Sequence, residues 1–250
     1  MNSKKKNNVV GLIPSRLNSK RLFGKALLEI DKLPLVIHTY KRAMLSKYLD
    51  AIYICTDSDE IIKIAKKYKC KYVRTGENKT GTDRISEAAD KIKQKFDLYV
   101  DIQGDEPLID PVHIDKVILW HQKNIIYDIV VPSLRTKNID TQHIVKIVKS
   151  NKKILYFSRA KVPYPFKKQN NIYLKHLSVI SFKPESLRKF RQLKESPLEK
   201  IEGIELMRAL ENNMLIGTFE LKGKSFSVDT NKDFIRAKEY MIDDKYRKKY

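Results

Sequence analysis

The chain has 250 residues, 42% of them hydrophobic, and its 51 lysines and arginines outnumber 30 acidic residues to give a formal net charge of +21. A chain of this length can bury a full core as one large domain, and no apolar run approaches the ~20 residues of a membrane-spanning helix. The cations are mostly lysines spread along the chain, so a lysine-rich surface explains them better than nucleic-acid binding, which stays an open alternative.

Predicted strands and helices alternate through the first half of the chain. The strands are VVGLIPS (9–15), AIYICTD (51–57), KYVRT (71–75) and LYVDIQ (98–103). The helices are LPLVIHTYKRAMLS (33–46), SDEIIKIAKKY (58–68), GTDRISEAADKIKQKF (81–96) and DPVHIDKVILWHQKN (110–124). Pro34 and Pro111 suit helix starts, and Ser58 suits a helix cap. This alternation predicts a parallel sheet covered by helices.

After about residue 127 the pattern changes, because strand-like runs follow one another. They are YDIVVPSLRT (127–136), HIVKIVKS (143–150), KILYFSRAKV (153–162) and YLKHLSVISFK (173–183). An amphipathic helix over 196–213, a strand over 214–221 and a closing helix capped by Asp229 or Thr230 complete the chain. These runs predict antiparallel additions to the parallel sheet, or a hairpin arm.

We expect one Rossmann-like, doubly wound α/β domain with a mainly parallel sheet over residues 8–243. A smaller β-rich part at about 127–195 is a candidate for dimerisation. Residues 1–7 are expected to be a disordered basic N-terminus, and 244–250 a solvated basic tail. The basic start of the sequence precedes no apolar stretch with a small-residue cleavage site, and Cys55 and Cys70 lack a CxxC spacing. Both features favour a cytoplasmic protein with reduced thiols over a secreted one.

The first strand runs into a strongly basic loop. Arg16, Lys20, Arg21 and Lys25 lie within ten residues after Pro14. In an open α/β sheet, ligands bind beyond the carboxyl ends of the strands, so Arg16, Arg21 and Lys25 could neutralise a polyphosphate there. The alternative is a solvated loop, which remains the simpler reading of Lys20. The loop is not a P-loop, because GxxxxGK[ST] is absent.

Carboxylates follow two other apolar stretches. Asp101, Asp105 and Glu106 lie in DIQGDEP, and in SFSVDT Asp229 lies at the end of another apolar stretch. Single carboxylates from different strands, completed by phosphate oxygens and water, suit Mg²⁺ better than an all-protein cage. Taken singly, Asp105 is better explained as a turn former and Asp229 as a helix cap.

Several motifs together resemble the CMP-sugar synthetases, and most closely the 3-deoxy-manno-octulosonate (Kdo) cytidylyltransferases, or CMP-Kdo synthetases. In chain order they are IPSRLNSKRLFGK, TGTDR, DIQGDEP, YFSRAKVPY, KHLSVI, SPLEKIEGIE and SVDT, and the resemblance runs from about residue 8 to 240. QGDEP together with YFSRA and SPLE is far more specific than any single motif. This family joins CMP from CTP to a 3-deoxy-2-keto sugar acid and releases pyrophosphate.

The resemblance implies a role for each matched residue. The implied CTP contacts are Leu12, Pro14, Ser15, Arg16, Lys25, Thr80 and Gln103, with Arg16 and Lys25 on the phosphates. The implied sugar-acid contacts are Gln103, Arg159, His176 and Glu205. Asp105 and Asp229 would hold Mg²⁺ and, with Arg16 and Lys25, form the catalytic set. The resemblance also implies a cytoplasmic homodimer.

General chemistry agrees with this assignment. The nucleophile would be the anomeric hydroxyl of the sugar, so the absence of a convincing Ser-His-Asp or Cys-His arrangement is expected, and displacement at phosphorus needs mainly positioning and charge neutralisation. The guanidinium of Arg159 suits a carboxylate bidentately, although an ordinary surface ion pair is its alternative. His176 stands alone in a strand, where a packed core histidine is the alternative.

The chain departs from the family pattern at four positions. Phe23 and Ala26 stand where the family has prolines beside Gly24 and Lys25. On the sugar side, Ile180 and Leu206 replace a tyrosine and a glutamine. A less polar wall discriminates less well for hydroxyl groups, so 8-amino-Kdo or a nonulosonic acid is the alternative substrate. The sequence leaves open lipopolysaccharide, capsule or another glycan as the destination of the product.

Overall fold

The computed structural model describes residues 8–19, 21–137, 142–166, 172–224 and 226–250. The expected disordered segment 1–7 and the cation Lys20 lie outside these residues. The elements of the first half are β1 (Val9–Pro14), η1 (Lys25–Leu27), β2 (Glu29–Ile30), β3 (Leu33–Pro34), α1 (Leu35–Ala43), β4 (Ala51–Thr56), α2 (Asp59–Lys67), β5 (Tyr72–Arg74), α3 (Gly81–Lys91), β6 (Leu98–Ile102) and α4 (Pro111–Lys123).

The second half begins with strands. Its elements are β7 (Ile129–Val130), β8 (Ser133–Thr136), β9 (Lys146–Ser150), β10 (Lys153–Ser158), β11 (Tyr173–His176), β12 (Val179–Phe182), α5 (Pro184–Gln192), α6 (Pro197–Glu202), α7 (Met207–Glu211), β13 (Ile216–Gly217), β14 (Glu220–Leu221), α8 (Asn231–Ile242) and η2 (Arg247–Lys249). None of the helices in the described part of the chain is long and apolar enough to cross a membrane.

The large sheet has the order β14-β8-β11-β9-β10-β13-β7-β12-β6-β1-β4-β5. The strands β6, β1, β4 and β5 are parallel neighbours, and β12 extends them by pairing antiparallel with β6. The chain winds outward from β1 through β4 to β5 and then returns to β6 on the other side of β1. The strand order therefore reverses between β1 and β6, which is where a doubly wound sheet binds its ligand. This arrangement confirms the predicted α/β fold class.

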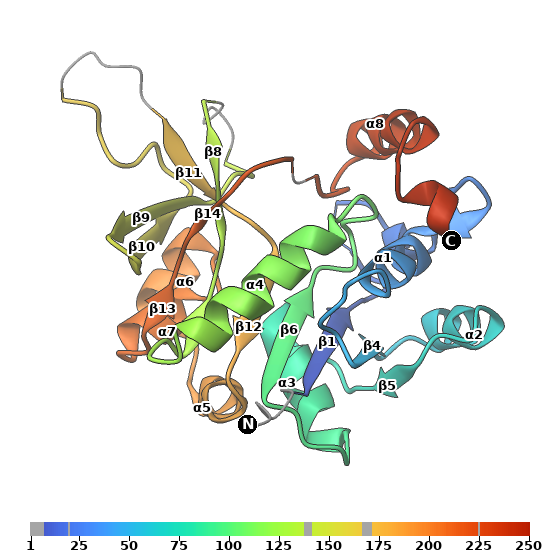
Figure 1. Ribbon diagram of the computed structural model, residues 1–250, viewed down its shortest axis with the longest axis horizontal. Helices are drawn as coiled ribbons and strands as arrows, with labels where there is room; N and C mark the ends of the chain where they lie inside the picture. Colours follow the sequence, from blue (N-terminus) through green and yellow to red (C-terminus); the bar gives the residue numbers. More distant parts are fainter. Residues whose placement is uncertain (1–7, 20, 138–141, 167–171, 225) are drawn as a thin grey trace, which may run out of the picture.

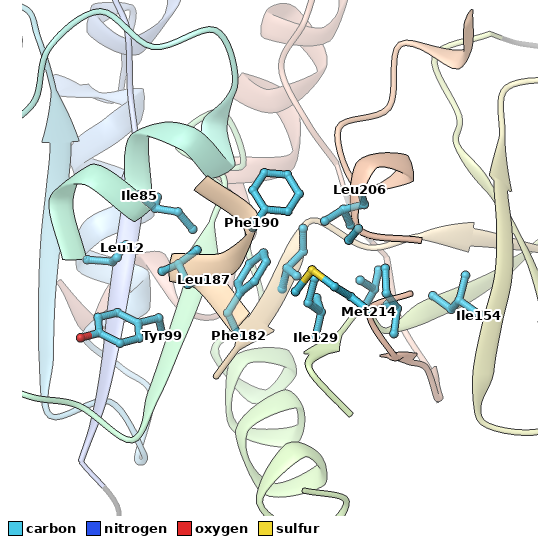
Figure 2. Packing of buried hydrophobic residues seen from close by; sticks show 14 of the residues in the cluster. Leu12, Ile85, Tyr99, Ile129, Ile154, Phe182, Leu187, Phe190, Leu206 and Met214 are labelled. Carbon is cyan, nitrogen blue, oxygen red and sulfur yellow. The ribbon is translucent and has the colours of Figure 1, made fainter. Parts of the chain in front are cut away.

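Two apolar layers cover the sheet (Figure 1). Buried side chains of α1, α2 and α4 pack on one face, and those of α3, α5 and α7 pack on the other. Figure 2 shows the second layer, in which Ile85, Leu187 and Phe190 lie over Leu12 and Phe182 of the sheet. Because both faces of the central strands are buried, the strands read in the sequence as continuous apolar runs rather than alternating ones.

Four details of the secondary structure differ from the sequence prediction. The helix expected over 81–96 ends at Lys91, and the strand expected over 214–221 is split into β13 and β14. Helix α5 was not predicted. The helix expected over 196–213 is two helices, because Gly203 ends α6 in the left-handed region at φ 60°. Glycine adopts that conformation without the strain that a Cβ would bring.

The last residues of the chain also differ from expectation. The segment 244–250 was expected to be solvated, but it packs against the domain. Tyr246 is 9% exposed and its hydroxyl donates to Asp110 Oδ1 at 2.9 Å. The hydroxyl of Tyr250 hydrogen-bonds Nδ1 of the buried His38 at 3.0 Å. The lysines of this segment are exposed, so charge alone did not reveal that its tyrosines are docked.

Candidate active site

The two loops that leave β1 and β6 lie directly against each other at the point where the strand order reverses. A Cβ built on Gly104 would lie 2.8 Å from the carbonyl oxygen of Pro14 and 3.3 Å from Cγ2 of Ile13. No side chain larger than hydrogen fits in that gap, so Gly104 permits the close approach. Thr39 Oγ1 of α1 donates to the Gly104 carbonyl at 3.3 Å, which ties the β6 loop to that helix. The Ser15 amide donates to the Cys55 carbonyl of β4 at 2.9 Å, which ties the β1 loop to the sheet.

A cavity of about 510 Å³ opens beyond these loops. All of the predicted CTP contacts except Leu12 line it, and they are Pro14, Ser15, Arg16, Lys25, Thr80 and Gln103. The two predicted metal ligands, Asp105 and Asp229, line it as well. Leu12, whose backbone was predicted to line the cytosine site, is not among the residues that line this cavity, and its side chain is completely buried in the core. Thr80 is held at the N-terminus of α3, where its Oγ1 accepts from the Asp83 amide at 3.1 Å.

Lys25 lies between the two carboxylates predicted for the metal. Its Nζ donates to Asp105 Oδ2 at 2.5 Å and to Asp229 Oδ1 at 3.1 Å. Burial by itself would lower the pKa of Lys25, but Asp105 and Asp229 outweigh it and hold the pKa above its ordinary value. Arg21 also contacts Asp229, at 2.9 Å. Residues far apart in sequence therefore meet in one cluster, in which the cationic side chains of Lys25 and Arg21 alternate with the carboxylates of Asp105 and Asp229.

Asp229 is available to a ligand because its neighbour caps the helix. Thr230 is the N-cap of α8, and its Oγ1 accepts from the Asp233 amide while the Asp233 carboxylate accepts from the Thr230 amide. The sequence left open whether Asp229 or Thr230 was the cap. Asp229 does not end a strand as expected, but lies in an irregular segment that is tied to the β6 loop by the Val228 amide, which donates to Asp105 O at 2.9 Å.

The donor set fits a hard divalent cation. Asp105 and Asp229 both contact one ammonium group, which acts as their counter-ion, and each is about one-fifth exposed. Among the described residues no group of three or more His, Cys, Asp or Glu side chains gathers to hold a metal. Two carboxylates open to phosphate oxygens and water suit Mg²⁺, which retains several non-protein ligands. Asp101 is excluded from such a role because it is fully buried in β6.

A second cavity, of about 990 Å³, adjoins the first. Both cavities are lined by Arg16, Thr80, Gln103, Asp105 and Asp229, so the carboxylates lie where the two spaces meet. All four residues predicted for the sugar acid line the second cavity: Gln103, Arg159, His176 and Glu205. Gln103 is oriented by its Nε2, which donates to Asp101 Oδ2 at 2.8 Å.

Arg159 is fixed in place by backbone carbonyls rather than by a surface ion pair. Its guanidinium donates to Glu202 O at 2.8 Å, Gln142 O at 2.7 Å and Gly203 O at 3.0 Å. A guanidinium has five N–H groups, so it retains donors for a carboxylate. The break at Gly203 therefore both ends α6 and supplies an acceptor that orients Arg159.

His176 and Glu205 both lie where burial disfavours their charged forms. Burial first, and then Lys175 and Arg159, lower the pKa of His176 to about 4, so the ring is neutral at pH 7. Burial raises the pKa of Glu205 although hydrogen bonds from Thr80 and Thr82 partly oppose it. Glu205 accepts from Thr82 Oγ1 at 2.8 Å. It thus joins α3 to the segment between α6 and α7 while facing the second cavity.

Three residues that line the second cavity or support its lining were not predicted from the sequence. Lys175 lines it directly. Lys146 is completely buried and donates to Arg159 O at 2.5 Å. Glu202 accepts from Ser158 Oγ at 2.7 Å and from the Arg159 amide at 2.8 Å, which joins the end of β10 to α6. The only sequence signal for Glu202 was its place in SPLEKIE, beside the residues of that matched motif.

Ile180 and Leu206 form an apolar part of the same cavity wall. Both line the cavity, and they are 3% and 1% exposed. Ile180 lies opposite Asp101 in the register of β12 and β6. The two aliphatic residues that were expected to reduce the polarity of the sugar site thus both lie in the wall of the second cavity.

Comparison with known proteins agrees with this geometry. The model of the cytidylyltransferase family matches residues 10–216. A 3-deoxy-manno-octulosonate cytidylyltransferase of Chlorobium phaeobacteroides is 37% identical over 91% of this chain and 95% of its own length. An 8-amino-3,8-dideoxy-manno-octulosonate cytidylyltransferase of Shewanella baltica is 34% identical over 95% of this chain and all of its own length.

A solved structure shows the same fold over nearly the whole chain. It is a CMP:2-keto-3-deoxy-manno-octonic acid synthetase complexed with CTP, with a TM-score of 0.89 and 28% identity, covering 94% of this chain and 98% of the other. The chain therefore belongs to the cytidylyltransferase family, as a nucleotidyltransferase related to the 3-deoxy-manno-octulosonate cytidylyltransferases.

Proposed function

We propose that this protein transfers CMP from CTP to the anomeric hydroxyl of a 3-deoxy-2-keto sugar acid, preferentially Kdo, and releases pyrophosphate. The observation that carries the proposal is the pair of adjoining cavities with Asp105 and Asp229 at their junction. One cavity is lined by the basic loop and the other by Arg159 and His176. A nucleotide triphosphate and an acidic acceptor can therefore meet at the carboxylates.

On the nucleotide side, Arg16 and Lys25 neutralise the phosphates and Thr80 contacts the base. Pro14 and Ser15 supply the wall on which the nucleoside rests. Lys25 is bonded to two carboxylates in the structure. A triphosphate would compete with these carboxylates for its ammonium. Positioning and charge neutralisation of this kind account for most of the rate enhancement in phosphoryl transfer.

Asp105 and Asp229 are the residues that would hold Mg²⁺. When bound there, the ion would lower the pKa of the acceptor hydroxyl and neutralise the leaving pyrophosphate. Lys25 keeps the two carboxylates close together when no other cation lies between them. The fixed Val228–Asp105 backbone bond preserves their spacing.

On the sugar side, Arg159 recognises the carboxylate of the acid. Gln103, the neutral His176 and Glu205 provide hydrogen-bond partners for its hydroxyl groups. A neutral histidine can both donate and accept a hydrogen bond, which suits a hydroxyl group better than an imidazolium would. Lys175 adds a second cation to this wall.

An 8-amino sugar acid is the second candidate substrate. Two observations favour it as the alternative: the aliphatic Ile180 and Leu206 in the cavity wall, and the relative of Shewanella baltica that is named for the 8-amino acid. A site that makes no hydrogen bond to a hydroxyl group distinguishes only weakly between a substrate that carries this hydroxyl and one that does not. The kcat/KM values for Kdo and its 8-amino analogue should therefore differ only modestly.

We further propose a cytoplasmic homodimer built on the β-rich part. Tyr164 and Phe166, which follow β10, are 81% and 91% exposed, and Ile172 is 48% exposed. Exposed aromatic side chains such as Tyr164 and Phe166 are typical of protein interfaces. Both cysteines are buried free thiols, in keeping with a reducing compartment. Sedimentation should show a dimer, and Phe166→Asp together with Tyr164→Asp should shift it to a monomer.

The test of the reaction is a panel of acids assayed with CTP and Mg²⁺. Kdo, 8-amino-Kdo and a nonulosonic acid are compared by pyrophosphate release, and each CMP-sugar is identified by mass spectrometry. We expect the highest kcat/KM with Kdo. Turnover of only the nonulosonic acid would refute the preferred substrate. No turnover with any acid, together with salt-dependent binding of RNA or DNA, would refute the enzyme in favour of a nucleic-acid-binding protein.

A further inference from the structure

Arg42 of α1 connects two segments that are remote from each other in sequence. Its side chain is 2% exposed. Nε donates to Ile109 O at 2.6 Å and Nη2 to Leu108 O at 3.1 Å, both just beyond the loop that carries Asp105. Nη1 donates to Asp244 Oδ1 at 2.5 Å, just beyond α8. One buried guanidinium therefore binds the continuation of both carboxylate-bearing segments.

The residues after α8 close over Arg42 and α1. We call residues 243–250 the C-terminal clasp. The ring of Tyr246 lies 5.0 Å from the Arg42 guanidinium, and its hydroxyl donates to Asp110 at 2.9 Å. Arg247 pairs with Asp31, and Tyr250 bonds His38 at 3.0 Å. The clasp thus contacts α1, the β2–β3 turn and the segment before α4.

Helix α8 has few other attachments. It lies at the edge of the molecule, apart from the sheet (Figure 1). Only Ala237 and Met241 of its twelve residues are buried, in a small cluster with Ile30, Leu35 and Val228, against which Phe234 packs partly buried. Ile235 and Ile242 are 57% and 76% exposed. The helix is therefore held by a narrow apolar contact along its length and by polar contacts at its two ends.

We propose that the C-terminal clasp is a positioning device for Asp229. It acts through α8: the clasp fixes the last turn of the helix on Arg42, and the first turn presents Asp229 to Lys25 and Asp105. This inference rests on the proposed function, in which Asp229 is one of the two carboxylates that hold Mg²⁺. Neither Arg42 nor Tyr246 touches the cavities, so both act only through other residues.

The length and stiffness of α8 explain how contacts at its last turn can control the position of Asp229 at its first turn. A helix of twelve residues is about 18 Å long and rigid, so release of its last turn lets the first turn tilt about the narrow contact at Ala237 and Met241. A displacement of about 1 Å at a catalytic group can reduce the rate by about 100-fold. The direct tie from Val228 to Asp105 limits the movement at the near end, which places the expected loss nearer tenfold than 100-fold.

Two changes test the clasp on the full chain. Tyr246→Phe removes the bond to Asp110, and a chain ending at Ile242 removes every clasp contact, including the bond of Asp244 to Arg42. The matched control is Tyr240→Phe on α8, whose hydroxyl bonds only to the exposed Arg236 among the described contacts. We expect both clasp variants to remain folded, to need about tenfold more Mg²⁺ for half-maximal rate, and to keep a CTP KM within about twofold of the unmodified chain.

A second measurement is independent of catalysis. Amide hydrogen exchange without ligands should accelerate at Val228 and in the first turn of α8 in both clasp variants, but not in Tyr240→Phe. Unchanged exchange at these amides, or a loss of rate that added Mg²⁺ does not restore, would overturn the proposal. If the unmodified protein turns over no sugar acid, the proposed function fails, while the exchange experiment still decides whether the clasp positions Asp229.

Discussion

Gly104→Ala should separate the two loops that form the nucleotide site. The added Cβ would lie 2.8 Å from Pro14 O, a backbone atom that no rotamer change can move, and 3.3 Å from Ile13 Cγ2. Relief requires the β1 and β6 loops to part by several tenths of an ångström. Overpacking of this kind costs about 1–3 kcal/mol, which corresponds to a fall in Tm of about 3–10 °C for a chain of this size.

The functional effect should exceed the loss of stability. Pro14, Ser15, Gln103 and Asp105 all line the cavity around this contact, so their separation should raise the CTP KM and lower kcat at a temperature where the variant is fully folded. Calorimetry and initial rates at varied CTP measure the two effects. Gly76→Ala is the control, because its Cβ would meet only ordinary contacts at 3.7 Å and beyond. Equal Tm and KM values for the two variants would refute this reasoning.

Three further predictions concern charge. Asp105→Asn should lower kcat by at least about 100-fold with little change in Tm. The control Asp90→Asn, which removes a surface ion pair with Arg191, should leave kcat unchanged. Near-normal turnover of Asp105→Asn would exclude Asp105 as a metal ligand. Lys25→Met removes the counter-ion of Asp105 and leaves Asp229 paired with Arg21, so Mg²⁺ should raise the Tm of the variant more than that of the unmodified protein. An equal rise would show that Lys25 does not compete with the ion. Burial lowers the pKa of His121 to about 4, below the value of about 6.5 in the unfolded chain. The unfolded chain therefore takes up a proton first as the pH falls, and the free energy of unfolding should decrease by about 3 kcal/mol from pH 6.5 to pH 4. Urea unfolding of His121→Gln should show a weaker dependence of this free energy on pH, and an unchanged dependence would contradict the assignment.

Local signals predicted the parallel half of the fold well. Ser58 caps α2 as its position implied, and Pro111 begins α4. These features depend on residues within one turn of each other, so the sequence contains them directly. The charged loop after β1 could likewise be predicted as a binding loop. In an open α/β sheet the residues that follow the carboxyl end of a strand lie beside the ligand crevice.

Tertiary contacts explain what the sequence did not predict. The pattern over 196–213 is amphipathic throughout, and only the carbonyl partners of Arg159 show why the helix must break at Gly203. Similarly, lysines in the last seven residues suggested a solvated tail. The docking of Tyr246 and Tyr250 depends on Asp110 and His38, which no local pattern connects to them. The backbone of Leu12 was assigned to the nucleotide on its motif, but Leu12 lies inside β1, before the strand end at Pro14 that opens to the cavity, and its side chain is buried.

The most direct test of the central proposal is the stoichiometry of the reaction of the unmodified protein with CTP, Kdo and Mg²⁺. Phosphorus NMR follows CTP, pyrophosphate and the CMP-sugar phosphodiester in one sample. The proposed mechanism predicts one pyrophosphate and one CMP-Kdo for each CTP consumed, with no free CMP formed at early times. Free CMP without the phosphodiester, or no loss of CTP, would contradict it.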